Sequence, residues 1–302
     1  MAAPLVSICI PTYNYRRYLP DALESALEQT ARDIEILIVD NCSEDGTMEL
    51  LEEFARRDGR VVRHRNLKNL GMMANFNRCI TLARGKYIKF LCADDVLTAD
   101  CVERMVTAIE ERPDIRLAGC GRQYFRDRGE PLKTLAYAPQ RIAVPGTTVI
   151  RDCFFKGNLI GEPTAVLFRK ADVGTGFNQS YQQAFDMELW FRLLAQGWFA
   201  FLGEPLCGIR EHRSSGTADN LKAGTVTEDK VRLFEEYAHR PYLRGSLIER
   251  LRWDGRMASS VAREAAAGST RIGEDILGAV YHPALFRFAT LPLVRAITVL
   301  RS

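Results

Sequence analysis

Two short apolar runs near the start of the chain restrict its fold more than any other feature. Residues 5–10 (LVSICI) and 34–40 (IEILIVD) are rich in β-branched side chains and are only long enough for strands. Runs that are apolar on both faces are typical of parallel strands covered by helices on both sides. Between them, Leu19, Leu23 and Ala26 recur at helical spacing. The first 40 residues therefore predict a βαβ unit.

The same alternation continues to about residue 118. Helical periodicity returns at residues 46–58 and 72–83, and strand-like runs occur at 61–65 and 86–92. A sheet with helices on both faces buries all of these apolar surfaces. The predicted fold class is therefore α/β, as a Rossmann-like three-layer α/β/α arrangement.

The second half of the chain is less regular. Residues 113–160 hold strand candidates interrupted by Gly, Pro and charged turns, residues 182–197 are clearly helical, and residues 210–220 have the composition of a polar loop. The remainder to the C-terminus has helical patterning. We expect one domain over residues 1–215 and a helical C-terminal extension over 216–302, which would contact the acceptor, a membrane or a second copy of the chain.

Composition excludes several classes of protein. The 302 residues carry a formal charge of only +3, with acidic and basic residues interspersed, which argues against nucleic acid as a partner. The eight cysteines include no C-x-x-C pair, so neither a zinc site nor a disulfide framework is predicted. We find no secretory signal and no apolar run of about 18 residues. The expected location is the cytoplasm.

The C-terminal segment, residues 282–302, leaves two interpretations open. Leu285, Phe288, Leu291 and Val294 fall at roughly helical spacing, with arginines among them. Such a helix could lie on an anionic membrane surface, at the inner face of the cytoplasmic membrane. It could equally pack on the protein's own core.

Polar and acidic residues follow the predicted strands. PTYN (residues 11–14) follows the first strand, DNCSEDGT (residues 40–47) contains the end of the second, and Asp94 and Asp95 follow the run at 86–92. Ligands of open α/β sheets bind beyond the carboxyl ends of the strands, where these groups would meet. Carboxylates gathered there predict Mg²⁺ or Mn²⁺ and a nucleotide diphosphate. Since the chain has no G-x-G-x-x-G after its first strand and no P-loop motif, metal and side chains must contact the phosphates.

Four segments in the same order and spacing resemble the inverting nucleotide-sugar glycosyltransferases of family two, which have the GT-A fold. They are residues 6–30 (VSICIPTYNYRRYLPDALESALEQT), 35–47 (EILIVDNCSEDGT), 69–100 (NLGMMANFNRCITLARGKYIKFLCADDVLTAD) and 185–197 (FDMELWFRLLAQG). The resemblance extends over about residues 4–213. It implies a GT-A-like mixed sheet and transfer of a sugar from a nucleotide diphosphate.

The resemblance also implies which residues bind the nucleotide. A loop after the first strand would hold the base and ribose, chiefly through its second and third residues. An acid at the end of the second strand would accept a hydrogen bond from the pyrimidine N–H, and an N-x-G loop would lie on the nucleotide side. These positions are Pro11, Thr12, Tyr13 and Asn14, then Asp40, and then Asn69 and Gly71.

For metal binding and catalysis, the resemblance points to three further places. Asp94 and Asp95 match the ribose and metal acids of the D-x-D-type motif, with Asp95 the preferred direct ligand of Mn²⁺ or Mg²⁺. His212 lies in a segment similar to the family's R-x-H and would help to bind the metal or the diphosphate. Asp186 matches the general base.

The sequence departs from the family pattern at three positions. Cys92 replaces the first acid of the metal motif, and its thiol prefers softer metals. Asn41 replaces a frequent second acid, and Phe185 stands where a glutamate often precedes the base.

Each candidate also has a purely structural interpretation. Asp94, Asp95 and Asp40 are residues that favour turns and caps, and Asp186 could merely favour the N-terminus of a helix. His212 could be a loop histidine without a ligand. Trp190 is better explained by core packing than by sugar stacking, because it lies on an apolar helix stripe.

The resulting expectation is an inverting, metal-dependent glycosyltransferase that uses a UDP- or dTDP-sugar and a hydroxyl of a glycan or lipid-linked glycan. The alternative is a non-catalytic nucleotide-sugar-binding or partner-binding module on the same fold. A sugar nucleotidyltransferase is disfavoured, because PTYN is not a Gly- and Arg-rich triphosphate loop.

Overall fold

The structure is a computed structural model that describes residues 3–126, 129–212 and 223–243, with residues 260, 263, 264 and 266. The chain divides into two compact units, each described by itself below. The first comprises Met1–Ile150, Leu159–Gln179 and Leu189–His212, and the second Arg151–Asn158, Ser180–Glu188 and Arg213–Ser302. The predicted helix at 282–302 lies outside the described residues. Within the described part, no helix is long and apolar enough to cross a membrane.

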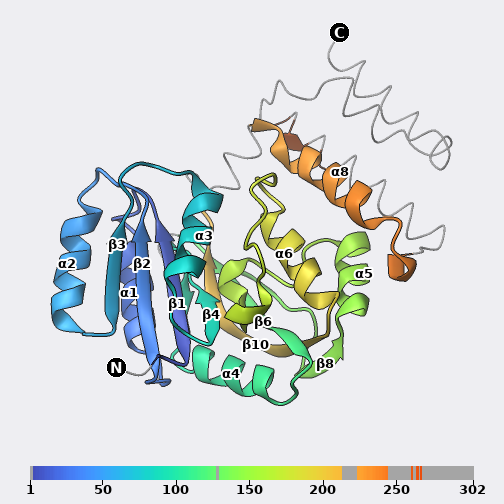
Figure 1. The fold of residues 1–302 in the computed structure, drawn as a ribbon, viewed down its shortest axis with the longest axis horizontal. Helices are drawn as coiled ribbons and strands as arrows, with labels where there is room; N and C mark the ends of the chain where they lie inside the picture. Colours follow the sequence, from blue (N-terminus) through green and yellow to red (C-terminus); the bar gives the residue numbers. More distant parts are fainter. Residues whose placement is uncertain are drawn as a thin grey trace, which may run out of the picture. The chain divides into compact units, whose positions relative to one another are not determined.

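The four strands predicted for the first half of the chain are confirmed. β1 (Val6–Thr12) pairs in parallel with β2 (Ile34–Asp40) and with β4 (Tyr87–Phe90), and β2 pairs in parallel with β3 (Val61–Arg65). Every residue of β1 and β2 is buried. This is the burial expected of parallel strands covered on both faces (Figure 1).

Helices cover both faces of these strands. Val6, Ile8 and Ile10 of β1 share one core cluster with buried residues of α1, α2 and α4. On the opposite face, Phe90 of β4 packs against Phe76 of α3, with ring centroids 5.0 Å apart. The predicted three-layer α/β/α arrangement is therefore confirmed. The helices are α1 (Leu19–Leu27), α2 (Thr47–Arg57), α3 (Met72–Leu82) and α4 (Cys101–Glu110).

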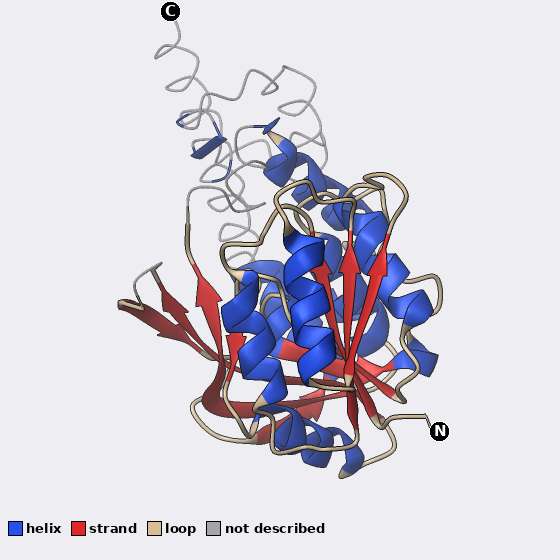
Figure 2. Cartoon of the chain, turned by 90° about the vertical axis from the view of Figure 1, so that its left-hand side faces the viewer, coloured by secondary structure: helices blue, strands red, loops and turns tan. Residues whose placement is uncertain are grey.

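The rest of the sheet is mixed in direction (Figure 2). The strand order is β3-β2-β1-β4-β9-β6-β10-β5, with β7 beside β6 and β8 beside β10. β9 runs antiparallel to both β4 and β6, whereas β10 runs parallel to β6. The added strands are β5 (Val96–Leu97), β6 (Ile115–Phe125), β7 (Pro131–Leu135), β8 (Ile142–Pro145), β9 (Val166–Arg169) and β10 (Trp198–Arg210).

Among the elements that the sequence did not predict, two are long. Residues 113–160 contain the expected strands but also helix α5 (Gly146–Lys156). The β-branched residues near its start disfavour a helix by propensity, but Val149 and Ile150 are fully buried, so tertiary packing decides. The long strand β10 was not predicted, and the expected polar loop begins inside it, at Arg210.

Helix α6 (Phe185–Leu194) confirms the helical prediction for that segment. Within the first unit, Trp190 is fully buried, donates its indole N–H to the carbonyl oxygen of Gly161 at 3.3 Å, and packs against Phe168. The core interpretation of Trp190 is therefore confirmed.

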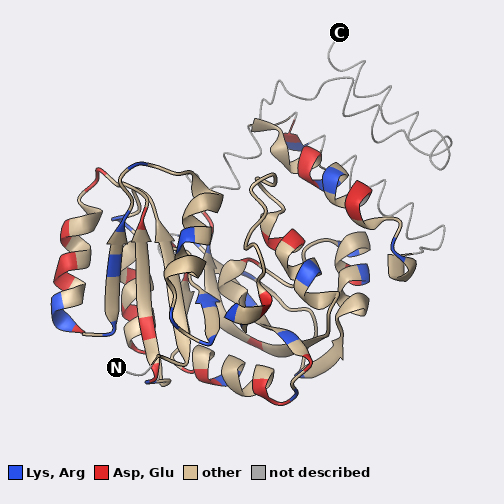
Figure 3. Cartoon of the chain, in the orientation of Figure 1, with Lys and Arg blue, Asp and Glu red and all other residues tan. Residues whose placement is uncertain are grey.

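The remaining described elements are short helices in the first unit and two helices in the second. They are η1 (Pro163–Ala165), η2 (Lys170–Asp172), α8 (Thr225–Tyr237) and η3 (Pro241–Leu243). Figure 3 shows Lys and Arg interspersed with Asp and Glu over the described helices and strands, as the nearly balanced charge predicts.

Candidate functional site

The carboxyl ends of β1 and β2 meet at one edge of the sheet. Their parallel register ends with Thr12 opposite Asp40. β4 runs parallel to β1 on its other side and leads into Cys92, Asp94 and Asp95. Residues separated by up to 83 positions in the sequence therefore follow neighbouring strand ends, where α/β sheets bind ligands.

The loops after β1 and β2 are tied together by Asn14. Its backbone N–H donates to Ser43 Oγ at 2.8 Å, and its side-chain Oδ1 accepts from the backbone N–H of Glu44 at 2.9 Å. Asn14 has φ of 54°, a left-handed conformation that asparagine tolerates better than most residues. Pro11 is buried, whereas Tyr13 is exposed and free to contact a ligand.

Asp40 is completely buried at the end of β2. Its carboxylate accepts from the backbone N–H of Ser43 at 3.1 and 3.2 Å, and Arg65 Nε lies 3.5 Å from Oδ2. Asp40 does cap the following turn, but an ionised carboxylate has about four acceptor positions, so a ligand contact remains compatible. Next to it, the hydroxyl of Thr12 is buried and has no hydrogen-bond partner among the described residues.

Asn41, which replaces a family acid, holds the loop that contains Asn69 and Gly71. Its Nδ2 donates to Asn69 Oδ1 at 2.8 Å, and its Oδ1 accepts from Asn66 Nδ2 at 2.9 Å and from the Leu70 N–H at 3.0 Å. An amide both donates and accepts, whereas an ionised carboxylate only accepts. Sequence reasoning missed this role, although the recurrence of asparagine in the two loops was an available signal.

Asp95 is buried, and both of its carboxylate oxygens are occupied by protein donors. Oδ2 accepts from Thr164 Oγ1 at 2.6 Å, and Oδ1 accepts from the Arg210 backbone N–H at 3.0 Å. Burial, followed by the nearby charge of Asp94, raises the pKa of Asp95 well above its ordinary value. These contacts hold Asp95 at the turn, and its carboxylate, like that of Asp40, keeps acceptor positions for a further contact.

Asp94 is the more accessible of the two acids, with 15% of its side chain exposed. Its Oδ2 lies 2.8 Å from His212 Nε2, and its backbone oxygen accepts from Arg210 Nε at 2.8 Å. Asp94 is thus more exposed than Asp95, and the preference for Asp95 as the direct metal ligand stays a prediction from the sequence.

His212 is not an unattached loop histidine. Its ring lies 4.7 Å from the ring of Tyr18 and 5.9 Å from that of Tyr15, and only 4% of its side chain is exposed. Its Nδ1 is buried and has no partner among the described residues. The tyrosines thus hold the imidazole with Nε2 against Asp94.

The pair of Asp94 and His212 fits one side of a divalent ion. The 2.8 Å contact between them is a hydrogen bond, which a bound ion would replace. Carboxylate oxygen suits Mg²⁺ and Mn²⁺, whereas imidazole nitrogen is more typical of Zn, Cu, Fe and Ni sites. Among the described residues, no group of three or more His, Cys, Asp or Glu side chains is placed to hold a metal.

Cys92 adds no charge to this pair. Burial, together with Asp95 and Asp94, raises the pKa of the Cys92 thiol well above its ordinary value, so it stays neutral. Its backbone N–H donates to Thr164 Oγ1 at 3.0 Å. At this position the chain contributes to the shape of the turn rather than a third acidic ligand.

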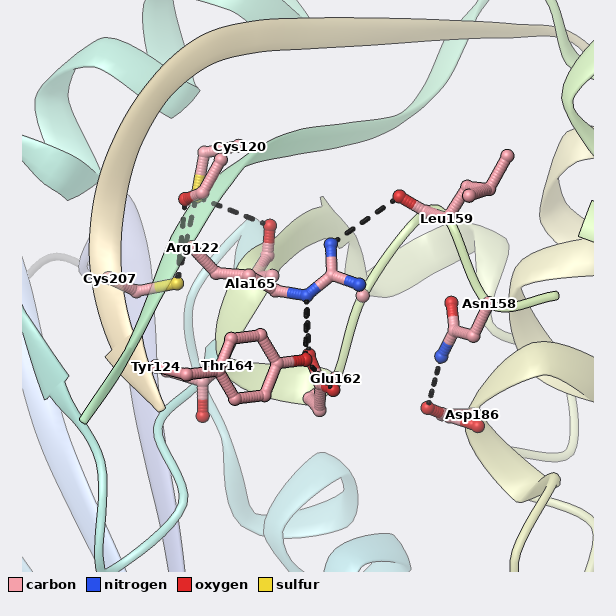
Figure 4. A network of polar contacts seen from close by, with 12 residues as sticks. Cys120, Arg122, Tyr124, Asn158, Leu159, Glu162, Thr164, Ala165, Asp186 and Cys207 are labelled. Atoms are coloured by element: carbon pink, nitrogen blue, oxygen red, sulfur yellow. Dashed lines mark hydrogen bonds and ion pairs between the residues drawn. The ribbon is translucent and has the colours of Figure 1, made fainter. Parts of the chain in front are cut away.

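Thr164 and Arg210 are site residues that sequence reasoning missed. Arg210 also pairs with Asp21 at 2.7 Å. The segment before Thr164 is anchored by Glu162, which accepts from the Tyr124 hydroxyl at 2.5 Å and pairs with Arg122 at 2.8 Å (Figure 4). Thr164 lies in η1 and Arg210 is the last residue of β10, both far from Asp94 and Asp95 in the sequence. Of the two, only Arg210 was indicated by the sequence, through the similarity to R-x-H.

Asp186 belongs to the second unit, where it is the second residue of α6. Its Oδ2 accepts from Asn158 Nδ2 at 3.1 Å (Figure 4). Its Oδ1 accepts from the Met187 N–H at 2.7 Å. The side chain is 7% exposed. Its predicted place in the first turn of a helix is confirmed. The structure brings Asp94, Asp95 and His212 together in the first unit.

Residues 7–177 match the family described as glycosyl transferase family 2, and this match spans more than half of the chain. The chain belongs to glycosyltransferase family 2. A putative teichuronic acid biosynthesis glycosyltransferase of Bacillus subtilis, TuaG, is 29% identical over 74% of this chain and 86% of its own length. An uncharacterized protein of Mycobacterium tuberculosis is 30% identical over 74% of this chain and 72% of its own length.

Solved structures share the fold of this family 2 chain. The mannosyltransferase PcManGT of Pyrobaculum calidifontis, in complex with GDP-Man and Mn²⁺, has a TM-score of 0.61 at 16% identity and covers 99% of this chain and 81% of its own. TarS of S. aureus, residues 1–349 in complex with UDP-GlcNAc, has a TM-score of 0.59 at 15% identity and covers 91% of this chain and 83% of its own. The GT-A fold predicted from the sequence is confirmed.

Proposed function

We propose that this chain transfers a sugar from a UDP- or dTDP-sugar to a hydroxyl group of a glycan or lipid-linked glycan, with inversion at the anomeric carbon. The observation that carries the proposal is the contact of Asp94 with His212 at the strand ends of a family 2 domain. The similarity to TuaG supports an acceptor that belongs to a cell-envelope polymer. The donors named for PcManGT and TarS support a nucleotide sugar as the ligand class.

The donor nucleotide would be held by the loops after β1, β2 and β3. The Thr12 hydroxyl, which has no partner among the residues that the structure describes, and the exposed Tyr13 are available for the base and ribose. Asp40 has acceptor capacity left for a base N–H. Asn41 keeps Asn69 and Gly71 in place, so the loop is organised before a ligand arrives. Preorganisation of this kind lowers the ordering cost of binding.

Asp94 and His212 would hold Mn²⁺ or Mg²⁺ together with the diphosphate. When bound, the ion would neutralise the negative charge that the leaving diphosphate gains. Thr164 and Arg210 act indirectly, because they occupy both oxygens of Asp95 and so set the turn that presents Asp94.

Asp186 would serve as the general base on the acceptor. Its carboxylate would take the proton of the acceptor hydroxyl while that oxygen bonds to the anomeric carbon and the bond to the diphosphate breaks. A single displacement of this type inverts the anomeric centre. A general base typically contributes about 10² to 10⁴ in rate.

A thermal-shift screen of UDP-, dTDP- and GDP-sugars, with and without Mn²⁺, tests donor binding. A ligand at about 100 times its Kd adds roughly 2.7 kcal/mol of stability. We expect a shift for a UDP- or dTDP-sugar that depends on Mn²⁺ and is lost in Asp94→Asn. A Mn²⁺-dependent shift that survives in Asp94→Asn would reject the metal assignment.

Turnover tests the reaction itself. The Asp186→Asn variant should keep the thermal shift of the wild-type protein and lose transfer to the acceptor by about 10² to 10⁴. Full activity of this variant would refute the assignment of the base. Binding without turnover in the wild-type protein, with a range of glycan acceptors, would favour the non-catalytic binding module.

Contact with the inner face of the cytoplasmic membrane and self-association stay predictions. Liposome sedimentation of the full chain and of a chain that ends at residue 281 would test the role of residues 282–302. Equal sedimentation of both would refute membrane contact through this segment.

A further inference from the structure

We propose that Asp229 of α8 is a positioning residue for Asp186, which gives the helical extension a direct part in the transfer reaction. This inference rests on the proposed role of Asp186 as the general base and deepens it. Asp229 lies beyond the part of the chain that the family 2 match spans. Neither a motif nor its sequence spacing singles it out.

A single carboxylate oxygen of Asp229 gathers three consecutive backbone N–H groups. Oδ2 accepts from Gln182 at 2.7 Å, from Gln183 at 2.5 Å and from Ala184 at 2.9 Å. Asp229 is 2% exposed, so water contributes little to these groups. Hydrogen bonds to an ionised acceptor are roughly twice as strong as neutral ones, and burial strengthens them further.

These three N–H groups immediately precede α6, which begins at Phe185. These groups belong to residues before the helix and so have no partner within it, and the negative charge of a carboxylate is favourable near a helix N-terminus. Asp229 therefore holds the backbone that leads into α6. Asp186 is only two residues beyond the last of these contacts, so a change in this segment reaches the proposed base directly.

The carboxylate of Asp186 is held from a different side by Asn158, whose Nδ2 donates to its Oδ2, and by the Met187 N–H. Asp229 thus sets the backbone and Asn158 orients the side chain. A catalytic base must be held to within about half an ångström of its productive position. A displacement of about 1 Å can cost about 10²-fold in rate.

The same pair of elements offers a matched control. Tyr181 is fully buried, and its hydroxyl donates to Glu236 Oε2 of α8 at 2.8 Å. The Tyr181→Phe variant therefore also removes a side-chain hydrogen bond between this segment and α8. It leaves the three N–H groups before α6 with their acceptor.

The first test reads the position of Asp186 without any substrate. The full chain is labelled with ¹⁵N-methionine, and the Met187 amide signal is assigned with a Met187→Leu variant. Because this N–H donates to Asp186 Oδ1, its chemical shift and hydrogen exchange report on the contact. In Asp229→Asn we expect a moved signal and exchange about tenfold faster or more, with Tyr181→Phe close to wild type.

An unmoved Met187 signal in a folded Asp229→Asn protein overturns the proposal. So does an equal response in Tyr181→Phe, because a general loosening would then be responsible. If Asp229→Asn does not fold, Asp229→Glu keeps the charge and displaces the acceptor oxygen by one methylene group. A wild-type Met187 signal in Asp229→Glu then overturns the proposal.

The second test uses turnover, read as nucleoside diphosphate released from the UDP- or dTDP-sugar that gives the thermal shift, in the presence of a glycan acceptor. Asp229→Asn should lower kcat by about 10- to 100-fold with KM within about twofold. In the Asp186→Asn background it should cause no further loss, because it acts through that residue. A multiplicative loss in the double variant overturns the proposal.

The two hypotheses fail in different ways. Full activity of Asp186→Asn refutes the general base itself. Loss of activity in Asp186→Asn together with a wild-type kcat in Asp229→Asn refutes only the positioning role.

Discussion

Thr164→Val replaces one hydroxyl of the site by a methyl group of nearly the same volume. Thr164 is fully buried, and its Oγ1 donates to Asp95 Oδ2 at 2.6 Å while accepting from the Cys92 N–H at 3.0 Å. The substitution leaves Asp95 with one protein donor in place of two. It also leaves the Cys92 N–H without its acceptor.

The magnitude follows from these two contacts. Loss of a hydrogen bond to a charged group costs about 1.5–3 kcal/mol, and a buried unsatisfied donor costs about 1–3 kcal/mol. Because both effects arise from one hydroxyl, we expect the free energy of unfolding of the first unit to fall by about 2–4 kcal/mol. The cost should be largest where Asp95 is ionised. It should shrink as the pH falls through the raised pKa of Asp95, because the carboxyl group is then neutral.

Urea unfolding of wild-type protein and Thr164→Val, followed by tryptophan fluorescence, measures this loss. Thr107→Val is the control, since Thr107 Oγ1 donates to the Glu103 carbonyl oxygen at an exposed position on α4. The control should change stability by no more than about 0.5 kcal/mol. A loss below about 0.5 kcal/mol for Thr164→Val as well would refute the structural role given to Asp95 and its donors.

Three further outcomes are expected. Burial acts to raise the pKa of Glu35, but hydrogen bonds from the Ser7 hydroxyl and from Arg84 outweigh it and lower that pKa. Glu35 therefore stabilises the folded protein at pH values above its ordinary pKa, and this contribution is lost as the pH falls through the lower pKa of the folded state. Glu35→Gln should therefore cost about 1–3 kcal/mol in urea unfolding at neutral pH and less in acid; equal losses at both would contradict this. Gly85→Ala should destabilise the first unit by at least about 1 kcal/mol, because the added Cβ would lie 2.5 Å from the backbone nitrogen of Ser7 in β1. An unchanged melting temperature would contradict this prediction. His212→Ala should remove the Mn²⁺-dependent part of the thermal shift by UDP-sugars, and a retained Mn²⁺ effect would exclude His212 as a ligand.

Adjacent aspartates illustrate the limit of prediction from the sequence. Asp94 and Asp95 have the same chemistry and neighbouring positions, and the resemblance to family two favoured Asp95 as the ligand. Thr164, 69 residues away, and Arg210, 115 residues away, each donate to one oxygen of Asp95, whereas Asp94 contacts His212. These distant partners follow from strand order, which a local pattern does not contain.

What the sequence alone determined is the part of the fold written in short-range periodicity. The apolar runs of β1 and β2 and the helical spacing between them are local signals, so the α/β class, the strand ends that carry Asp40 and Asp94, and the helical setting of Asp186 could be predicted. The tertiary structure alone decided how those groups are held. Long-range hydrogen bonds place Asn41 against the loop that contains Asn69 and Asp229 against the segment before Asp186. Burial makes α5 helical despite its β-branched start, because tertiary packing outweighs local preference.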